Sequence, residues 1–131
     1  MRMASINIKD GLVGDLFLKD YVVDFGENEN GSWEKWHSGK LVQTKVVVVA
    51  RTATSTFLDY TWTLPIPIHD DTKVIYTGTF ECIQQGVDYR YGKLLKRFSG
   101  SATQQTFRGK DEDSNLFNDY KFRLKAEGRW K

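Results

Sequence analysis

The stretch LFNDYKFRLKAEGRW, residues 116–130, decides the fold class of this chain. Every second position is apolar or aromatic over most of its length, and the positions between them are mostly charged. The apolar set is Leu116, Tyr120, Phe122, Leu124, Ala126 and Trp130. A period of two is typical of a β-strand with one buried and one solvated face. We therefore expect a long amphipathic strand, in which Asn118 is the polar exception on the buried face and needs a hydrogen-bond partner there.

Working outward, other stretches alternate in the same way. FLDYTWTL puts Leu58, Tyr60, Trp62 and Leu64 on one face, and KVIYTGTFECI does the same for Val74, Tyr76, Gly78, Phe80 and Cys82. LVQTKVVVVA becomes apolar on both faces toward its end, which predicts a strand passing from a sheet edge into the centre of the fold. We also expect a strand in LFLKDYVVDF, residues 16–25, where Leu12, Leu16 and Phe17 have helical spacing as the alternative, and another strand around Ser99–Phe107.

These strands predict the fold class. Six to eight strands without crossover helices make an antiparallel, all-β fold, here one domain over residues 1–131. Long strands in a small domain must curl into a closed barrel or a bent two-sheet sandwich. We favour a single antiparallel β-barrel, because closure removes exposed edges, and keep the bent two-sheet β-sandwich as the alternative.

Composition narrows the function classes. The 131 residues carry a net charge of +2, which is too small to indicate nucleic-acid binding by itself. Cys82 is the only cysteine, so no intrachain disulfide is expected. The start of the chain shows no signal-peptide pattern, and no apolar run approaches the length of a membrane helix, so we expect a cytoplasmic location without membrane contact.

Few residues are candidates for catalysis or metal binding. Cys82 shares the parity of Phe80 and is expected to be inert core filler. The acidic run starting at Asp111 begins like a calcium loop but lacks its glycine and its closing glutamate, so we expect neither a metal nor a cofactor. Asp59 and Glu81 lie opposite their strands' aromatics and are expected to be exposed. If the faces opposite the aromatics instead line the cavity of a barrel, Asp59 is the first candidate for a general base.

A set of aromatic and polar residues suggests a ligand site. Gly31-Ser32-Trp33 early in the chain and Arg129 before Trp130 resemble calycin barrels, the lipocalin-type ligand binders, over four residues. That resemblance implies a barrel around a ligand. An aromatic-lined cavity would hold an apolar, partly oxygenated molecule. The candidate ligand-binding residues are Trp33, Trp36, Tyr60, Trp62, Tyr76, Asn118 and Tyr120. The alternative is that the tryptophans fill the core or plug a barrel end.

A second set combines basic and aromatic residues close together in the sequence. Its members are Tyr89, Arg90, Tyr91, Lys96 and Arg97. Nucleobases stack on aromatic rings while cations follow phosphates, so the set is a candidate single-stranded nucleic-acid surface. The modest net charge favours a solvated hairpin instead.

Three functions remain. The first is binding of a small apolar molecule, with isomerase- or cyclase-type activity left open. The second is a non-enzymatic interaction or assembly domain, such as a phage or viral structural component, an inhibitor or an immunity-type protein. It predicts an exposed apolar patch or edge strand, and a protein partner or defined homo-oligomer. The third is nucleic-acid binding through residues 89–98. We favour binding of a small molecule, because the excess of aromatic residues lies on the strand faces that are expected to point inward.

Overall fold

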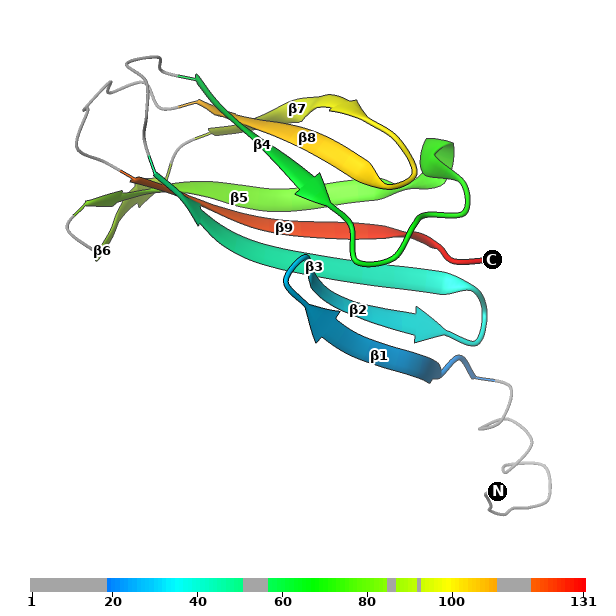
Figure 1. Cartoon of the computed structure of the whole chain (residues 1–131). Helices are drawn as coiled ribbons and strands as arrows, with labels where there is room; N and C mark the ends of the chain where they lie inside the picture. Colours follow the sequence, from blue (N-terminus) through cyan, green and yellow to red (C-terminus); the bar gives the residue numbers. More distant parts are fainter. Residues whose placement is uncertain (1–18, 51–56, 85–86, 92, 111–118) are drawn as a thin grey trace.

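Nine strands and one short helical turn make up the described part of the chain (Figure 1). The computed structural model describes residues 19–50, 57–84, 87–91, 93–110 and 119–131. The strands are β1 (Val22–Asn28), β2 (Gly31–Trp36), β3 (Lys40–Val49), β4 (Phe57–Thr63), β5 (Ile75–Gln84), β6 (Val87–Tyr91), β7 (Lys93–Gly100), β8 (Gln104–Lys110) and β9 (Asp119–Arg129), and the 3-10 turn η1 spans Asp71–Lys73.

The strands form two open antiparallel sheets. The large sheet has the order β1-β2-β3-β9-β5-β6, and the small sheet has the order β4-β8-β7. The described strands do not close into a barrel, so the favoured barrel was wrong and the two-sheet alternative fits. The physical reason is that β1 and β6 end the large sheet without pairing with each other. That the chain is a single domain over residues 1–131 stays a prediction.

The core lies between the two sheets. The small sheet covers one face of the large sheet, and the pair β1 and β2 extends beyond it (Figure 1). Aromatic rings from both sheets meet in the interior: the rings of Tyr60 and Phe122 stack at 5.7 Å, and those of Trp62 and Phe107 lie 6.3 Å apart. Gly109 of β8 packs so closely on Phe80 that a Cβ there would collide with the ring.

The predicted strand near the end of the chain is confirmed over residues 119–129. Tyr120, Phe122, Leu124 and Ala126 are all buried, while the charged residues between them are exposed or half-buried. The faces predicted for β4 and β5 are confirmed as well, and Cys82 is fully buried in the core. Residues 116–118 lie outside the described part.

Two strand predictions were wrong. The expected strand around Ser99–Phe107 is a hairpin, because Ser101 interrupts it: its hydroxyl accepts hydrogen bonds from the backbone N–H groups of Thr103 and Gln104. β3 does not pass from an edge to the centre: its residues 41–44 pair with both β2 and β9, whereas residues 45–49 pair with β9 and with no residue of β2. Its apolar residues on the second face are exposed instead.

Buried polar side chains fasten the large sheet to the loop after β4. Gln43 of β3 donates to the carbonyl oxygen of Ile66 at 3.0 Å and accepts from its N–H at 2.8 Å. The indole N–H of Trp62 reaches the carbonyl oxygen of Asn30, in the turn between β1 and β2, at 2.6 Å. These bonds satisfy backbone groups that would otherwise be buried unpaired, and they hold β1 and β2 in place.

The turn between β1 and β2 requires glycine. Gly31 has a φ of +125°, which L side chains rarely adopt, and a Cβ there would collide with the carbonyl oxygen of Thr44. The two-residue connection, Glu29 and Asn30, sets the register in which Phe25 lies opposite Glu34.

No helix in the described ranges is long and apolar enough to cross a membrane. The cytoplasmic location stays a prediction.

Candidate interaction surface

Four of the predicted ligand-binding residues lie between the two sheets. Trp62 and Tyr120 are buried, and Tyr60 and Tyr76 pack against the same core. The Tyr120 ring stacks on Phe80 at 5.0 Å, and Tyr76 meets Phe107 edge-on at 5.5 Å. Burial raises the pKa of the Tyr60 hydroxyl. Their ring contacts fill the space between the sheets. A ligand-binding role for them stays a prediction.

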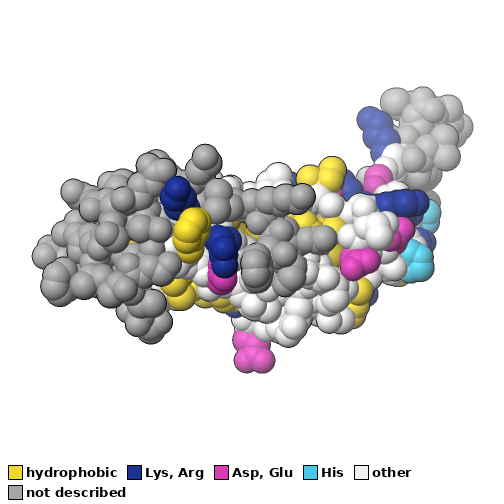
Figure 2. All heavy atoms as spheres, turned by 90° about the horizontal axis from the view of Figure 1, so that it is seen from above, with side chains coloured by type: hydrophobic (Ala, Val, Ile, Leu, Met, Phe, Trp, Pro, Cys, Tyr) yellow, Lys and Arg dark blue, Asp and Glu magenta, His cyan; other side chains and the backbone are white. Residues whose placement is uncertain are grey.

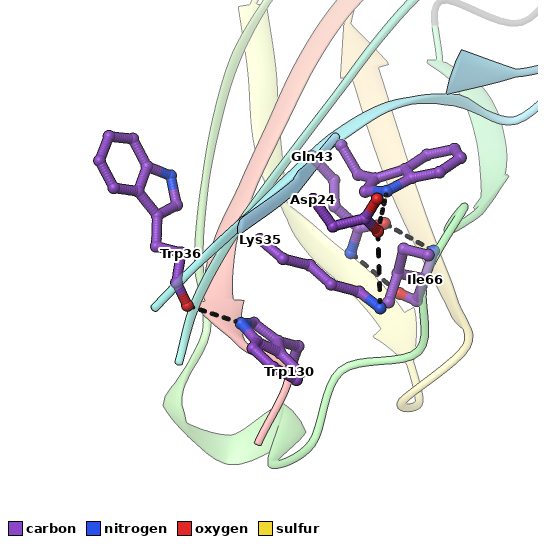
Figure 3. Close-up of polar contacts among 7 residues, drawn as sticks. Asp24, Lys35, Trp36, Gln43, Ile66 and Trp130 are labelled. Carbon is purple, nitrogen blue, oxygen red and sulfur yellow. Dashed lines mark hydrogen bonds and ion pairs between the residues drawn. The ribbon is translucent and has the colours of Figure 1, made fainter. Parts of the chain in front are cut away.

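Of the other two tryptophans in the predicted set, Trp33 is partly buried and packs against the same core, whereas Trp36 does not belong to that cluster. Trp33 donates its indole N–H to Asp24 at 3.2 Å, and Asp24 also lies 3.9 Å from the Lys35 ammonium (Figure 3). The Trp36 ring points away from Trp130, whose indole N–H bonds the Trp36 carbonyl oxygen. Lys40 lies over the Trp36 ring at 4.1 Å. Trp36 therefore does not join the core aromatics.

The remaining predicted residues are only partly described. Asn118 lies outside the described residues, as does the calcium-like run at 111–116. Of the nucleic-acid set, Tyr89, Arg90 and Tyr91 belong to β6 and Lys96 and Arg97 to β7, strands of different sheets. The backbone alone is described there, and nucleic-acid binding stays a prediction.

The two candidate carboxylates are both paired with arginine. Asp59 is exposed on the small sheet, where Arg108 donates to its two oxygens at 2.7 and 3.0 Å. These bonds, against a smaller effect of burial, hold the pKa of Asp59 below its usual range, which disfavours a role as general base near neutral pH. Glu81 was expected to be exposed and is buried. The prediction failed because Arg123 compensates its charge at 3.1 Å.

The large sheet has a second face, directed away from the small sheet, which we call the outer face. No described strand covers it. The pairing register aligns one row of side chains across five strands of it: Phe25, Glu34, Val42, Glu127 and Ile75. Val46 and Val48 lie farther along β3 on the same face. Phe25 is 76% exposed, Ile75 66%, Val46 58% and Val48 53%. The outer face therefore exposes several apolar side chains, interspersed with charged ones such as Glu34 and Glu127.

A groove crosses the outer face over β1, β2 and β3. It has a volume of about 450 Å³. Phe25 and Val42 supply its apolar walls, and Glu27 and Glu34 supply carboxylates. At its floor the hydroxyls of Ser32 and Thr44 lie 2.7 Å apart. The groove is open to solvent, so it suits an inserted side chain of another protein better than an enclosed ligand.

Charge is divided along the outer face. Glu27 and Glu34 are exposed at the groove, and neither forms an ion pair with another described residue. At the other end of the face, Lys121 of β9 is the register partner of Val48, and Arg123, the register partner of Val46, is ion-paired with the buried carboxylate of Glu81 at 3.1 Å.

The exposed face of the small sheet differs from the outer face. Viewed from that side, the described surface shows charged side chains of both signs among uncharged ones (Figure 2). Its exposed aromatic, Phe57, is flanked by Arg108 and Lys110, whose charged groups lie 5.2 and 5.7 Å from the ring centre. Cations that pack on Phe57 reduce its apolar exposure, so we consider the outer face of the large sheet the better candidate surface.

Sequence reasoning missed Phe25, Val46, Val48 and Ile75 as functional candidates. A signal was present in the run Val46–Val49, which is apolar on both parities. In an antiparallel sheet with one covered face, such a run predicts either a second covering layer or an exposed apolar patch.

Comparisons with known proteins show similarity of fold. No protein-family model matches the chain, and no curated protein matches it. Among solved structures, an N-truncated R1-type pyocin tail fiber matches with a TM-score of 0.59 and 17% identity, covering 95% of this chain and 99% of that one. The P. aeruginosa R1 pyocin fiber, C-terminal residues 323–701, matches with a TM-score of 0.58 and 18% identity.

The two matches differ in extent. This chain covers 28% of the longer R1 fiber fragment, with 85% of its own length aligned. The P. aeruginosa R2 pyocin fiber gives a TM-score of 0.50 at 16% identity, with 86% of this chain and 26% of that one covered. At these identities the comparison shows that the chain shares the fold of pyocin fiber proteins.

Proposed function

We propose that the chain is a non-enzymatic assembly domain, which associates with protein through the outer face of its large sheet. The observation that carries the proposal is the exposure of Phe25, Val46, Val48 and Ile75 on the outer face, in a protein whose aromatic core is filled by its own side chains. An apolar sheet face left open in a folded domain is typical of an interaction surface.

The fold comparison supports the same function. The matching structures are described as a pyocin fiber and a pyocin tail fiber. We infer by analogy of fold that the chain serves in a fiber-like or comparable structural assembly. Small-molecule binding, favoured by the sequence, has less support, because five of its seven predicted residues pack into or against the core: Trp33, Tyr60, Trp62, Tyr76 and Tyr120.

The proposal is tested by sedimentation of extracts from cells of the native source expressing tagged variants. We expect the wild-type chain to pellet with large assemblies and the Val46→Thr/Val48→Thr variant to stay in the supernatant, since threonine keeps the strand but removes apolar surface. Phe57→Thr, an exposed apolar-to-threonine change on the other sheet, is the matched control and should pellet. A wild-type chain that stays in small species and gains thermal stability with hydrophobic small molecules would overturn the proposal.

A further inference from the structure

The groove on the outer face gathers hydrogen-bond acceptors beside an exposed aromatic ring. Glu27 and Glu34 are exposed along it, and the hydroxyls of Ser32 and Thr44 meet at its floor. The ring of Phe25, which is 76% exposed, forms a wall of the groove. Carboxylates and the face of an aromatic ring both attract cations, so the chemistry of the groove favours a positively charged group.

The strand register brings the two carboxylates of the groove to one place. Glu34 of β2 lies opposite Phe25, and Glu27 lies two residues farther along β1, opposite Ser32. Diagonal neighbours of this kind are roughly 7–8 Å apart in an antiparallel pair. A cationic group between two such side chains can donate a hydrogen bond of about 2.7–2.9 Å to each carboxylate.

The described residues do not neutralise this pair of carboxylates. Neither Glu27 nor Glu34 forms an ion pair or a side-chain hydrogen bond within the described part of the chain. Lys125 is the register partner of Thr44 on β9, so β3 separates it from the strands that carry the two carboxylates. The described ranges also hold no group of three His, Cys, Asp or Glu side chains placed for a metal ion, which favours an organic cation.

We propose that the groove binds an arginine side chain of a partner protein. The inference rests on the proposed function and names the chemistry of the partner. The guanidinium lies between Glu27 and Glu34 and donates to both, while its other N–H groups face the hydroxyls of Ser32 and Thr44. Its plane stacks on the ring of Phe25. Arginine fits better than lysine, because its planar group has five donors and stacks on aromatic faces.

The experiment is a titration of the ¹⁵N-labelled full chain with three capped peptides, followed by the amide shifts in NMR spectra. The peptides differ only in a central arginine, lysine or citrulline between two leucines, and citrulline keeps the shape of arginine without its charge. We expect the arginine peptide to shift the amides of Ser32 and Glu34. The citrulline peptide should bind about fivefold more weakly, since ion pairs at an open site contribute modestly, and the lysine peptide should lie between the two.

Two variants locate the recognition. Glu27→Gln/Glu34→Gln keeps the shape of the groove and removes both charges, so the arginine and citrulline peptides should bind it equally. Glu127→Gln is the matched control: Glu127 lies on the outer face as the register partner of Val42, about 10 Å from Glu34 across two strand spacings, where salt screens its charge. It should keep the preference for arginine. Unchanged amide shifts outside the groove check that both variants fold.

Four results would overturn the inference: no shift of the groove amides, equal binding of the arginine and citrulline peptides, a lysine peptide that binds as tightly as the arginine peptide, or a preference for arginine that survives in Glu27→Gln/Glu34→Gln. None of them would overturn the assembly function, which fails on a different measurement, namely loss of pelleting together with stabilisation by hydrophobic small molecules.

Discussion

The two faces of the large sheet are built from the same strands and differ in how their side chains are satisfied. On the inner face, rings from β4 and β8 pack against those of β5 and β9, and the buried amide of Gln43 has two backbone partners. On the outer face, Phe25 and Ile75 are exposed, and Glu34 has no ion-pair partner among the described residues. We therefore expect the inner face to determine stability, and we propose that the outer face serves association.

The largest expected effect is on the inner face. Phe122 is fully buried and packs against Phe80 and Tyr60. We expect Phe122→Ala to lower the free energy of unfolding by about 3–5 kcal/mol, because it leaves a cavity between the sheets. Urea unfolding followed by tryptophan fluorescence measures this change. A loss below about 1 kcal/mol would contradict a tightly packed interior there.

The next effect concerns the buried amide of the inner face. Gln43→Ala leaves the N–H and carbonyl of Ile66 without their partner. We expect a loss of about 2 kcal/mol in unfolding free energy, the usual result for unsatisfied buried polar groups. Gln43→Glu is the control, since its carboxyl keeps an acceptor for the Ile66 N–H. Faster hydrogen exchange of that N–H in Gln43→Ala would locate the effect.

A smaller effect is expected at the ion pair on the small sheet, and it depends on pH. Arg108 lowers the pKa of Asp59 in the folded state below the usual 3.8. The stabilisation is therefore present above 3.8 and is lost as the pH falls through the lower folded-state value. Because both side chains are partly exposed, Asp59→Asn should cost at most about 0.5 kcal/mol at neutral pH. Unfolding curves over a pH series should converge in acid, and a constant difference would contradict this assignment.

The smallest expected effect is on the outer face. Val46→Thr should change the unfolding free energy of the dilute monomer by less than about 0.5 kcal/mol, since the side chain is already exposed. The same variant should weaken association. If dilute Val46→Thr lost as much stability as Phe122→Ala, the outer face would be a core face and our distinction would fail.

The sequence predicted well what depends on alternation within one strand. Tyr120 through Ala126 faced the core as expected, and so did Trp62 and Cys82. Barrel closure could not be predicted, because it depends on whether β1 and β6 pair, and alternation within each strand does not encode pairing between distant strands. The burial of Glu81 was missed for a similar reason: it requires Arg123, which lies far away in the sequence and on a neighbouring strand.

The candidate surface was also beyond sequence reasoning. Phe25 and Ile75 are far apart in the chain, and only the register through Glu34, Val42 and Glu127 aligns them. Inward aromatics favoured ligand binding, but any well-packed core produces the same pattern. The assembly alternative did predict an exposed apolar patch, and the structure has one.

The central position of β9 affects how the chain folds. β9 pairs with β3 on one side and β5 on the other, although Lys40 and its partner Arg129 are separated by most of the chain. Neither neighbour has its full hydrogen-bond ladder until residues 119–129 are in place, so closing these long loops must precede sheet formation. We therefore expect refolding in milliseconds to seconds, as for other proteins of high contact order. Until β9 inserts, β3 and β5 each present an unpaired edge, so a chain refolding at high concentration is at its greatest risk of aggregation during that interval.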